Sequence, residues 1–255
     1  MLTDTHVHLA HPALFFRLPE IFAQARQHGV TRFIAPAAEH ADWARLLELQ
    51  RQPEIRAAAI GIHPWYAQQA TPAALAELDA CLHRHPALLV GEIGLDFYDK
   101  TQTPEARACQ TQAFQDQLAL AQTHRRPVIL HSLRAAEAVI RCVRHTRFTQ
   151  GGIAHAFSGS LEEAALFMRH GFKIGIGALL LNPNAKKTRA AAQKLPLNAL
   201  LLETDSPFGR PEHAATPVRL RQIAETAAQL RGITLAELAA ACERNLAELL
   251  DEKAA

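Results

Sequence analysis

The sequence predicts an α/β fold, a single (β/α)8 barrel that spans residues 1–255. Two observations lead to this prediction. Eight short apolar segments recur along the chain, and longer stretches with helical patterning separate them. The length matches the roughly 250 residues of one such barrel, and 49% of the residues are hydrophobic, which is enough for one large core. We therefore expect one domain, with no linker between parts.

The eight apolar segments are the predicted strands. Several are continuous runs rich in Val, Ile and Leu, which is typical of parallel strands that are buried on both faces. In chain order the predicted strands cover residues 3–9, 31–37, 56–63, 88–95, 127–132, 151–157, 172–178 and 199–205. Because a helical segment separates most neighbouring strands, the pattern predicts a parallel (β/α)8 barrel.

The predicted helices are clearest at residues 72–85, 104–126, 217–232 and 235–253. Four helical segments end alike, in RQHG, HRHP, HRRP and MRHG, and a strand follows each one. Cations are favourable at a helix C-terminus, and Gly or Pro stops the helix there. Histidines in these last turns are therefore interpreted as structural residues. They are His28, His83, His85, His124 and His170.

Charge and cysteine content narrow the classes of protein that this chain can represent. The 27 basic and 25 acidic residues leave a net charge of +2, which predicts no strong field toward nucleic acid or an anionic membrane. No apolar run approaches the ~20 residues of a membrane span, and the N-terminus lacks a signal-peptide pattern. The four cysteines show no metal-binding or disulfide spacing. We expect a cytoplasmic protein without membrane contact or an obligate protein partner.

Seven ionisable side chains differ from the rest because they lie in or at the ends of six predicted strands. They are His6, His8, His63, Glu92, His131, His155 and Asp205. In a parallel barrel all of them reach the C-terminal mouth, where the active sites of this fold are built. Burying such groups without cations or strong partners is costly, and imidazole with carboxylate suits Zn, Mn or Fe. Seven candidates exceed the needs of one tetrahedral ion. The pattern predicts two divalent ions, of open identity, that share a carboxylate.

Six segments carry a family resemblance: DTHVHL, GIHPW, GEIGLDFY, ILHS, HAFSGS and LLETDSPF. In this order they resemble the motifs of the TatD family of metal-dependent hydrolases, which are often described as deoxyribonucleases. The resemblance implies a TIM barrel of the amidohydrolase type with a divalent-metal centre. It also implies that Glu92 ligates or bridges and that His63 lines the pocket. The further ligands that it implies are His6, His8, His131, His155 and Asp205.

Two positions depart from the family pattern. Relatives often carry Arg two residues after the histidine of the fifth strand, whereas this chain has Leu133 there and Arg134 next. The segment after LLETDSPF is GRPEHAATPVRL, which is short and lacks the family's Asn-x-Pro element. Both positions border the substrate site and therefore bear on substrate choice.

The main hypothesis is hydrolysis of phosphodiesters at DNA ends, as by a 3'-5' exodeoxyribonuclease. Two ions about 3.5–4 Å apart would activate a water molecule and neutralise the negative charge on the phosphoryl group during the in-line displacement. Asp205 would ligate one ion and take the proton of the attacking water, Glu92 would bridge, and His63 or His131 would polarise the substrate or the leaving group.

Three residues are candidates for contact with a single strand or a frayed end. The loop aromatics Trp65 and Tyr98 are placed to stack on bases, and Arg134 is available for a phosphate. Packing of Trp65 against the barrel rim is an equally supported interpretation.

Two other functions remain open at this point. The same metals can hydrolyse an amide, lactone or ester of a small molecule, and barrel and ligands alone do not separate these reactions. No lysine ends a predicted strand, so a carboxylated lysine cannot bridge the ions, and the remaining bridge, Glu92, favours phosphodiester chemistry. The third hypothesis is a binding module that keeps its metals without catalysis.

Overall fold

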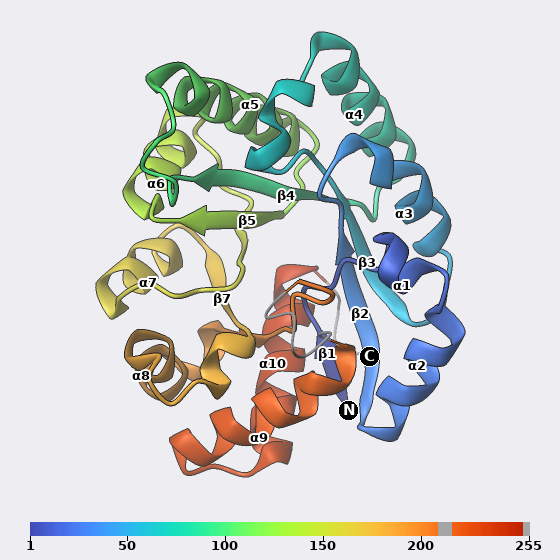
Figure 1. The fold of residues 1–255 in the computed structure, drawn as a ribbon, viewed down its shortest axis with the longest axis vertical. Coiled ribbons are helices and arrows are strands. Elements are labelled where there is room, and N and C mark those ends of the chain that lie inside the picture. Colours follow the sequence, from blue (N-terminus) through green and yellow to red (C-terminus); the bar gives the residue numbers. More distant parts are fainter. Residues whose placement is uncertain (209–215, 252–255) are drawn as a thin grey trace.

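The computed structural model describes residues 1–208 and 216–251. Eight parallel strands follow one another around a single sheet in chain order, as predicted, and the helices surround them (Figure 1). The strands are β1 (Leu2–Asp4), β2 (Val30–Pro36), β3 (Ile55–Ile60), β4 (Leu89–Asp96), β5 (Val128–Leu133), β6 (Gly152–Ala154), β7 (Phe172–Ile176) and β8 (Leu200–Leu202). The predicted (β/α)8 fold is therefore confirmed.

Several helices begin at a residue whose side chain caps the first turn. Thr71, Thr103, Ser160 and Thr234 accept hydrogen bonds from backbone N–H groups in the first turns of the helices that they precede. The α-helices are α1 (Pro12–Phe15), α2 (Leu18–Gln27), α3 (Trp43–Leu49), α4 (Pro72–Arg84), α5 (Pro104–Thr123), α6 (Ala136–His145), α7 (Leu161–Met168), α8 (Lys186–Lys194), α9 (Leu220–Arg231) and α10 (Leu235–Leu249). Short 3-10 helices are η1 (His40–Asp42), η2 (Pro64–Gln69), η3 (Ala178–Leu181), η4 (Leu197–Ala199) and η5 (Pro217–Arg219).

The seam between β8 and β1 is closed by the segments that follow these strands. Asp205 N–H donates to the carbonyl of His6 at 2.9 Å, and His8 N–H donates to the carbonyl of Ser206 at 2.8 Å. The β1 ladder ends at Asp4, earlier than predicted, so His6 and His8 lie in an extended continuation of the strand. The C-terminal helices α9 and α10 pack against β1 and β8.

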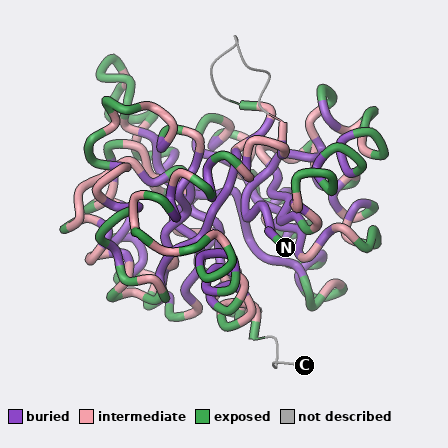
Figure 2. Tube along the Cα trace, turned by 90° about the horizontal axis from the view of Figure 1, so that it is seen from below, coloured by how far each residue is buried: buried purple, intermediate pink, exposed green. Residues whose placement is uncertain are grey.

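Buried residues fill the barrel and the layer between its strands and the outer helices, while the outward helix faces are exposed (Figure 2). Trp43 is among the largest fully buried side chains, and its indole N–H donates to the carbonyl of Gly61 at 2.9 Å. Several buried ionisable side chains, in contrast, gather at the carboxyl ends of the strands. The fold therefore concentrates its buried charge at one mouth.

Two further features concern the cysteines and the apolar character of the helices. All four cysteines are free thiols, and Cys109 alone among them is exposed. In residues 1–208 and 216–251, no helix is both long and apolar enough to cross a bilayer.

Candidate metal centre

Four side chains converge at the seam between β1 and β8. His6 Nε2 and His8 Nε2 lie 3.1 Å apart. Glu92 Oε2 lies 3.2 Å from His6 Nε2 and 3.4 Å from His8 Nε2. Asp205 Oδ1 lies 3.6 Å and 3.4 Å from the same two nitrogens. The predicted pair on the first strand therefore points at one spot, with two carboxylates.

The second oxygen of Glu92 faces a different set of imidazoles. Its Oε1 lies 2.8 Å from His131 Nδ1, 2.7 Å from His155 Nε2 and 3.4 Å from His63 Nε2. The facing nitrogens of His131 and His155 are 3.3 Å apart. The structure thus brings all seven predicted residues together, with the two oxygens of Glu92 shared between two groups.

The donor atoms fit divalent cations. Ligand atoms about 2.0–2.1 Å from a tetrahedral ion lie about 3.4 Å from one another. The five nitrogen and oxygen separations measured in the first group run from 3.1 to 3.6 Å. Imidazole nitrogens mixed with carboxylate oxygens are the ligands that Zn and similar ions prefer. The residues present therefore suit the metal that the sequence predicts.

The electrostatics show how the cluster balances its charge without metal. Burial raises the pKa of Glu92, but the charges of His155, His63 and His6 and a hydrogen bond from His131 outweigh burial and hold it well below its usual value. Burial lowers the pKa of His8, yet hydrogen bonds with the two carboxylates overcome burial and raise it to about 9. Protons on imidazoles thus compensate the carboxylates, and divalent ions would displace such protons on binding.

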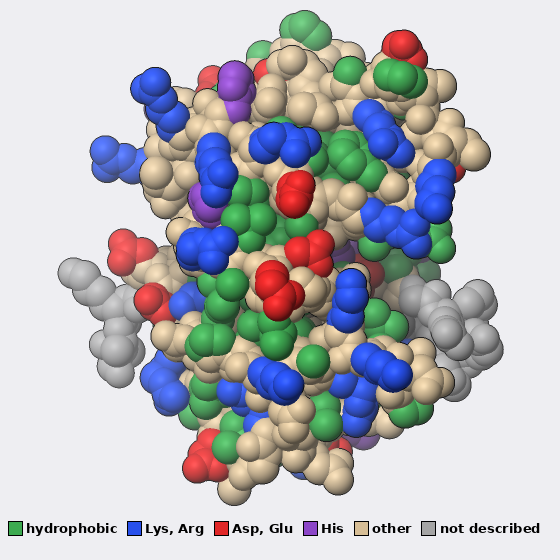
Figure 3. Space-filling model, turned by 90° about the vertical axis from the view of Figure 1, so that its left-hand side faces the viewer, with side chains coloured by type: hydrophobic (Ala, Val, Ile, Leu, Met, Phe, Trp, Pro, Cys, Tyr) green, Lys and Arg blue, Asp and Glu red, His purple; other side chains and the backbone are tan. Residues whose placement is uncertain are grey.

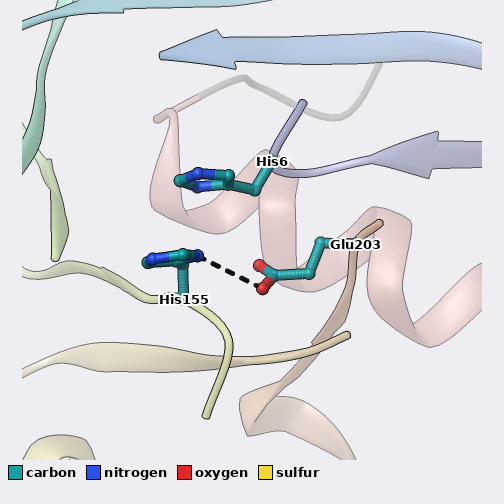
Figure 4. Close-up of side chains that lie close together, drawn as sticks. All are labelled: His6, His155 and Glu203. Carbon is teal, nitrogen blue, oxygen red and sulfur yellow. Dashed lines mark ion pairs between the residues drawn. The ribbon is translucent and has the colours of Figure 1, made fainter. Parts of the chain in front are cut away.

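Sequence reasoning missed Glu203, which is fully buried behind His155. Its Oε1 lies 3.5 Å from His155 Nδ1 and accepts a hydrogen bond from the N–H of Ala156 at 2.5 Å. Figure 4 shows the stacked rings of His6 and His155, with the Glu203 carboxylate directed at His155. Such a carboxylate fixes the ring orientation of a metal-ligating histidine. The available signal was the spacing, since Glu203 lies two residues before Asp205 in a segment that the sequence predicts as a strand.

Two aspartates were also missed. Asp4 is fully buried, and burial raises its pKa to about 8 despite hydrogen bonds donated by the hydroxyl and the N–H of Thr204. Asp4 therefore ties β1 to the segment after β8 beneath the cluster. Asp96 lies four residues after Glu92, and its Oδ2 is 3.2 Å from His131 Nε2. Positions 92, 94 and 96 share one strand face, which is the signal that sequence reasoning passed over.

The predicted substrate residues occupy two places. Trp65 lines the cavity over the cluster and is 61% exposed, so its ring forms part of the rim. Tyr98 is also exposed, and the guanidinium of Arg134 lies 4.7 Å from the centre of its ring. Tyr98 and Arg134 do not line the cavity; they form a stacked pair on the rim.

Comparison with known proteins decides the family. A family model described as TatD related DNase matches residues 3–251.

The chain belongs to the TatD family.

Two curated TatD-family relatives illustrate the similarity. The uncharacterized metal-dependent hydrolase YjjV of Escherichia coli K12 is 37% identical over 224 residues, which cover 83% of this chain and 85% of that protein. The 3'-5' ssDNA/RNA exonuclease TatD of Edwardsiella piscicida is 32% identical over 241 residues, covering 90% and 92% of the two chains. The predicted resemblance is thus confirmed, and the chain is a metal-dependent hydrolase.

Solved structures agree with this assignment. The crystal structure of YjjV, a TatD homolog from E. coli K12, matches with a TM-score of 0.90 at 33% identity and 98% coverage of both chains. An uncharacterized amidohydrolase from Saccharomyces cerevisiae has a TM-score of 0.82 at 16% identity over 97% of this chain and 99% of that one. The second similarity shows that TatD-family and amidohydrolase barrels share the fold.

The first departure from the TatD pattern lies at the end of β5. Leu133 pairs with Asp96 across β5 and β4, and Arg134 follows with a φ of 54°. Arg134, the residue after Leu133, thus places its guanidinium over the Tyr98 ring. The second departure is the segment of residues 209–220, of which residues 209–215 lie outside the described part of the chain. Phe208 before it lies with its ring centre 4.8 Å from that of His8.

Substituting Gly175 in β7 should disturb the centre through Glu203. A Cβ at Gly175 would lie 2.3 Å from Glu203 Oε2, so the buried carboxylate must shift, and its contact with His155 through Oε1 shifts with it. We expect Gly175→Ala to weaken zinc binding about 10–100-fold, as loss of such a supporting carboxylate does. Competition with a zinc chelator measures this affinity. A Cβ at Gly177 would meet Glu203 atoms no closer than 3.5 Å, so Gly177→Ala is the matched control. Wild-type affinity in Gly175→Ala would contradict the role of Glu203.

Proposed function

We propose that this chain is a phosphodiesterase that removes nucleotides from single-stranded or frayed DNA ends through a centre of two divalent ions. The observation that supports it best is the position of Glu92, because each oxygen of this one carboxylate faces a separate group of imidazoles. One domain of residues 1–255 would carry the activity. The four free thiols favour a reducing compartment such as the cytoplasm.

The residues divide between the ions as follows. His6, His8 and Asp205 would hold one ion, and His131 and His155 the other, with Glu92 between them. Bound ions would lower the pKa of a water molecule and neutralise charge on the phosphoryl oxygens.

Two residues have roles beyond holding metal. The Asp205 side chain is 31% exposed, so this carboxylate faces the solvent and can accept the proton of the attacking water. Burial lowers the pKa of His63, despite the nearby Glu92, which favours a neutral ring. A neutral His63 can donate a hydrogen bond to the substrate or leaving group.

The size of the cavity supports a substrate whose bulk stays outside. The cavity over the cluster measures about 100 Å³ and is lined by His8, His63, Trp65, Phe208 and six further residues. A water molecule takes about 30 Å³ in the liquid, whereas pockets that engulf drug-sized ligands measure about 300–1,000 Å³. Only a group about the size of a phosphoryl group fits. This favours the end of a polymer over the alternative of a small-molecule amide, lactone or ester.

The rim supports contact with unpaired bases. In the described part of the chain, Trp65, Tyr98 and Phe208 are exposed large apolar residues in segments that follow β3, β4 and β8. Stacking of a base on an aromatic ring contributes roughly 1–3 kcal/mol and tolerates any base. The Arg134 guanidinium beside Tyr98 adds a phosphate contact. The exonuclease activity named for the E. piscicida relative agrees with this substrate class.

The surface charge supports contact with only a few phosphates of the substrate. On the face that holds α6, α7 and α8, basic side chains are spread out and acidic ones gather near the middle (Figure 3). The whole chain has a net charge of +2. Activity should therefore fall only gently with salt, unlike proteins with 6–10 phosphate contacts, which lose about 10³–10⁵ in affinity between 50 and 200 mM.

A timed digest of end-labelled single-stranded and duplex oligonucleotides tests the proposal. We expect mononucleotides as the first products, faster from single strands, with complete loss of activity in EDTA. A parallel panel of lactones, amides and aryl esters is the control. Internal cuts as early products would overturn the action on ends. Absence of DNA cleavage with brisk turnover of a small ester would replace the proposal with the small-molecule alternative.

A further inference from the structure

We propose that Asp96 is a positioning residue that couples the Trp65 ring at the cavity rim to the His131 imidazole in the metal centre. The proposal rests on the proposed function of this site. Asp96 ends β4, is 4% exposed, and belongs to neither ligand group around Glu92.

One oxygen of Asp96 contacts both partners. The indole N–H of Trp65 donates to Asp96 Oδ2 at 2.7 Å. The same oxygen lies 3.2 Å from His131 Nε2, while His131 Nδ1 faces Glu92 Oε1 at 2.8 Å. A carboxylate at Nε2 favours the tautomer with its proton there, which leaves Nδ1 free as a metal ligand. A continuous chain of contacts thus runs from the rim through Asp96 to Glu92.

Three further hydrogen bonds hold Asp96 in place, one at its carboxylate and two at its backbone. Its Oδ1 accepts a hydrogen bond from the N–H of Tyr98 at 2.9 Å. The backbone N–H of Asp96 donates to Gln110 Oε1, and its carbonyl accepts from Gln102 Nε2, each at 3.0 Å. Gln110 is buried in α5. Because the backbone of Asp96 is fixed and one carboxylate oxygen contacts both Trp65 and His131, a change at either residue reaches the other through this oxygen.

Trp65 depends on this contact for its orientation. Trp65 is 61% exposed and gains little from burial, so the hydrogen bond from its Nε1 to Asp96 helps to fix where the ring lies. Trp65 also meets His63 edge to face, with ring centres 4.8 Å apart. The ring that would stack on a terminal base is therefore oriented by the carboxylate that orients His131. Asp96 would align the base with the bond to be cut.

Asp96→Asn is the first test, because the amide cannot accept hydrogen bonds at both of its terminal atoms. We expect zinc affinity to fall about 10–100-fold. Zinc binding should change the Trp65 emission of the wild type, and this response should be lost in the variant. Acrylamide quenching isolates exposed Trp65 from Trp43, which is buried. The exposed Asp99 makes contacts with Thr101 rather than the centre, so Asp99→Asn is the matched control and should leave both readouts unchanged.

Trp65→Phe is the second test, since it removes only the indole donor and keeps an aromatic ring. We expect zinc affinity to fall about two- to tenfold, the effect of losing one hydrogen bond. On a single-stranded oligonucleotide KM should rise more than kcat falls. Zinc affinity equal to wild type in both Asp96→Asn and Trp65→Phe would overturn the coupling. The zinc and fluorescence readouts need no DNA cleavage, so they test Asp96 even if the substrate is not DNA.

Discussion

Glu92→Gln should abolish hydrolysis, with kcat/KM reduced by more than about a thousandfold, or ~4 kcal/mol of transition-state stabilisation. Glutamine has nearly the same shape, but it offers one neutral oxygen and an NH2 group that repels cations. One of the two imidazole groups around Glu92 then loses its carboxylate oxygen. Wild-type protein purified without chelator should hold more than one divalent ion per chain, and the variant should hold fewer. Elemental analysis and the oligonucleotide digest measure both.

The fold should survive this substitution, because residues at the C-terminal mouth of a barrel serve chemistry while packing lies elsewhere. Circular dichroism and thermal melting check this expectation. The exposed Glu48 on α3 is a matched control, and Glu48→Gln should keep wild-type activity and metal content. Full metal content with full activity in Glu92→Gln would contradict the bridging role. A variant that folds only when metal is added would show that the centre is structural.

Gly94→Ala should destabilise the whole barrel by more than about 4 kcal/mol, a loss that single substitutions reach only through severe clash or strain. Gly94 pairs with His131 between β4 and β5, and it has a φ of 146°. A Cβ there would lie 2.0 Å from the backbone carbonyl oxygen of His131. Because this Cβ would meet backbone atoms of His131, no side-chain rotation can relieve the clash. Urea unfolding measures the loss, and aggregation on expression is the extreme form of the same result.

Gly232→Ala separates this clash from the cost of a left-handed backbone. Gly232 ends α9 with a φ of 67°, and a Cβ there would meet nothing within 4 Å. We expect a loss of about 1–2 kcal/mol from the left-handed conformation and wild-type activity. Equal stability of the two variants would show that β4 and β5 do not approach so closely at Gly94.

The alternation of apolar and helical segments determined the fold, because period and composition are local properties that a chain displays before it folds. The same reasoning placed the metal centre. In a parallel barrel every strand ends at the same mouth, so His63, His131 and His155 had to meet although 92 positions separate the first from the last. The topology of a parallel barrel was therefore enough to predict that these histidines lie close together.

Strand register was decided only by the tertiary structure. The pairing of Gly94 with His131 places Glu92, two residues before Gly94, within reach of the His131 imidazole. The sequence does not display register, because the same residues in a slipped ladder would have the same pattern. The early end of β1 has a related cause, since the segment that carries His6 and His8 pairs through Val7 with Ser206 rather than along a regular ladder.

The supporting carboxylates also required the fold. Asp96 and Glu203 lie within two to four residues of predicted ligands. The sequence pattern around such an acidic residue is the same, however, whether its side chain faces solvent or the barrel interior. Packing decides between these possibilities: Glu203 is fully buried against His155, and Asp96 is held by Gln110. The sequence alone thus determined the barrel and the residues that meet at its mouth. The tertiary structure decided how they are oriented, because orientation depends on contacts between segments far apart in the chain.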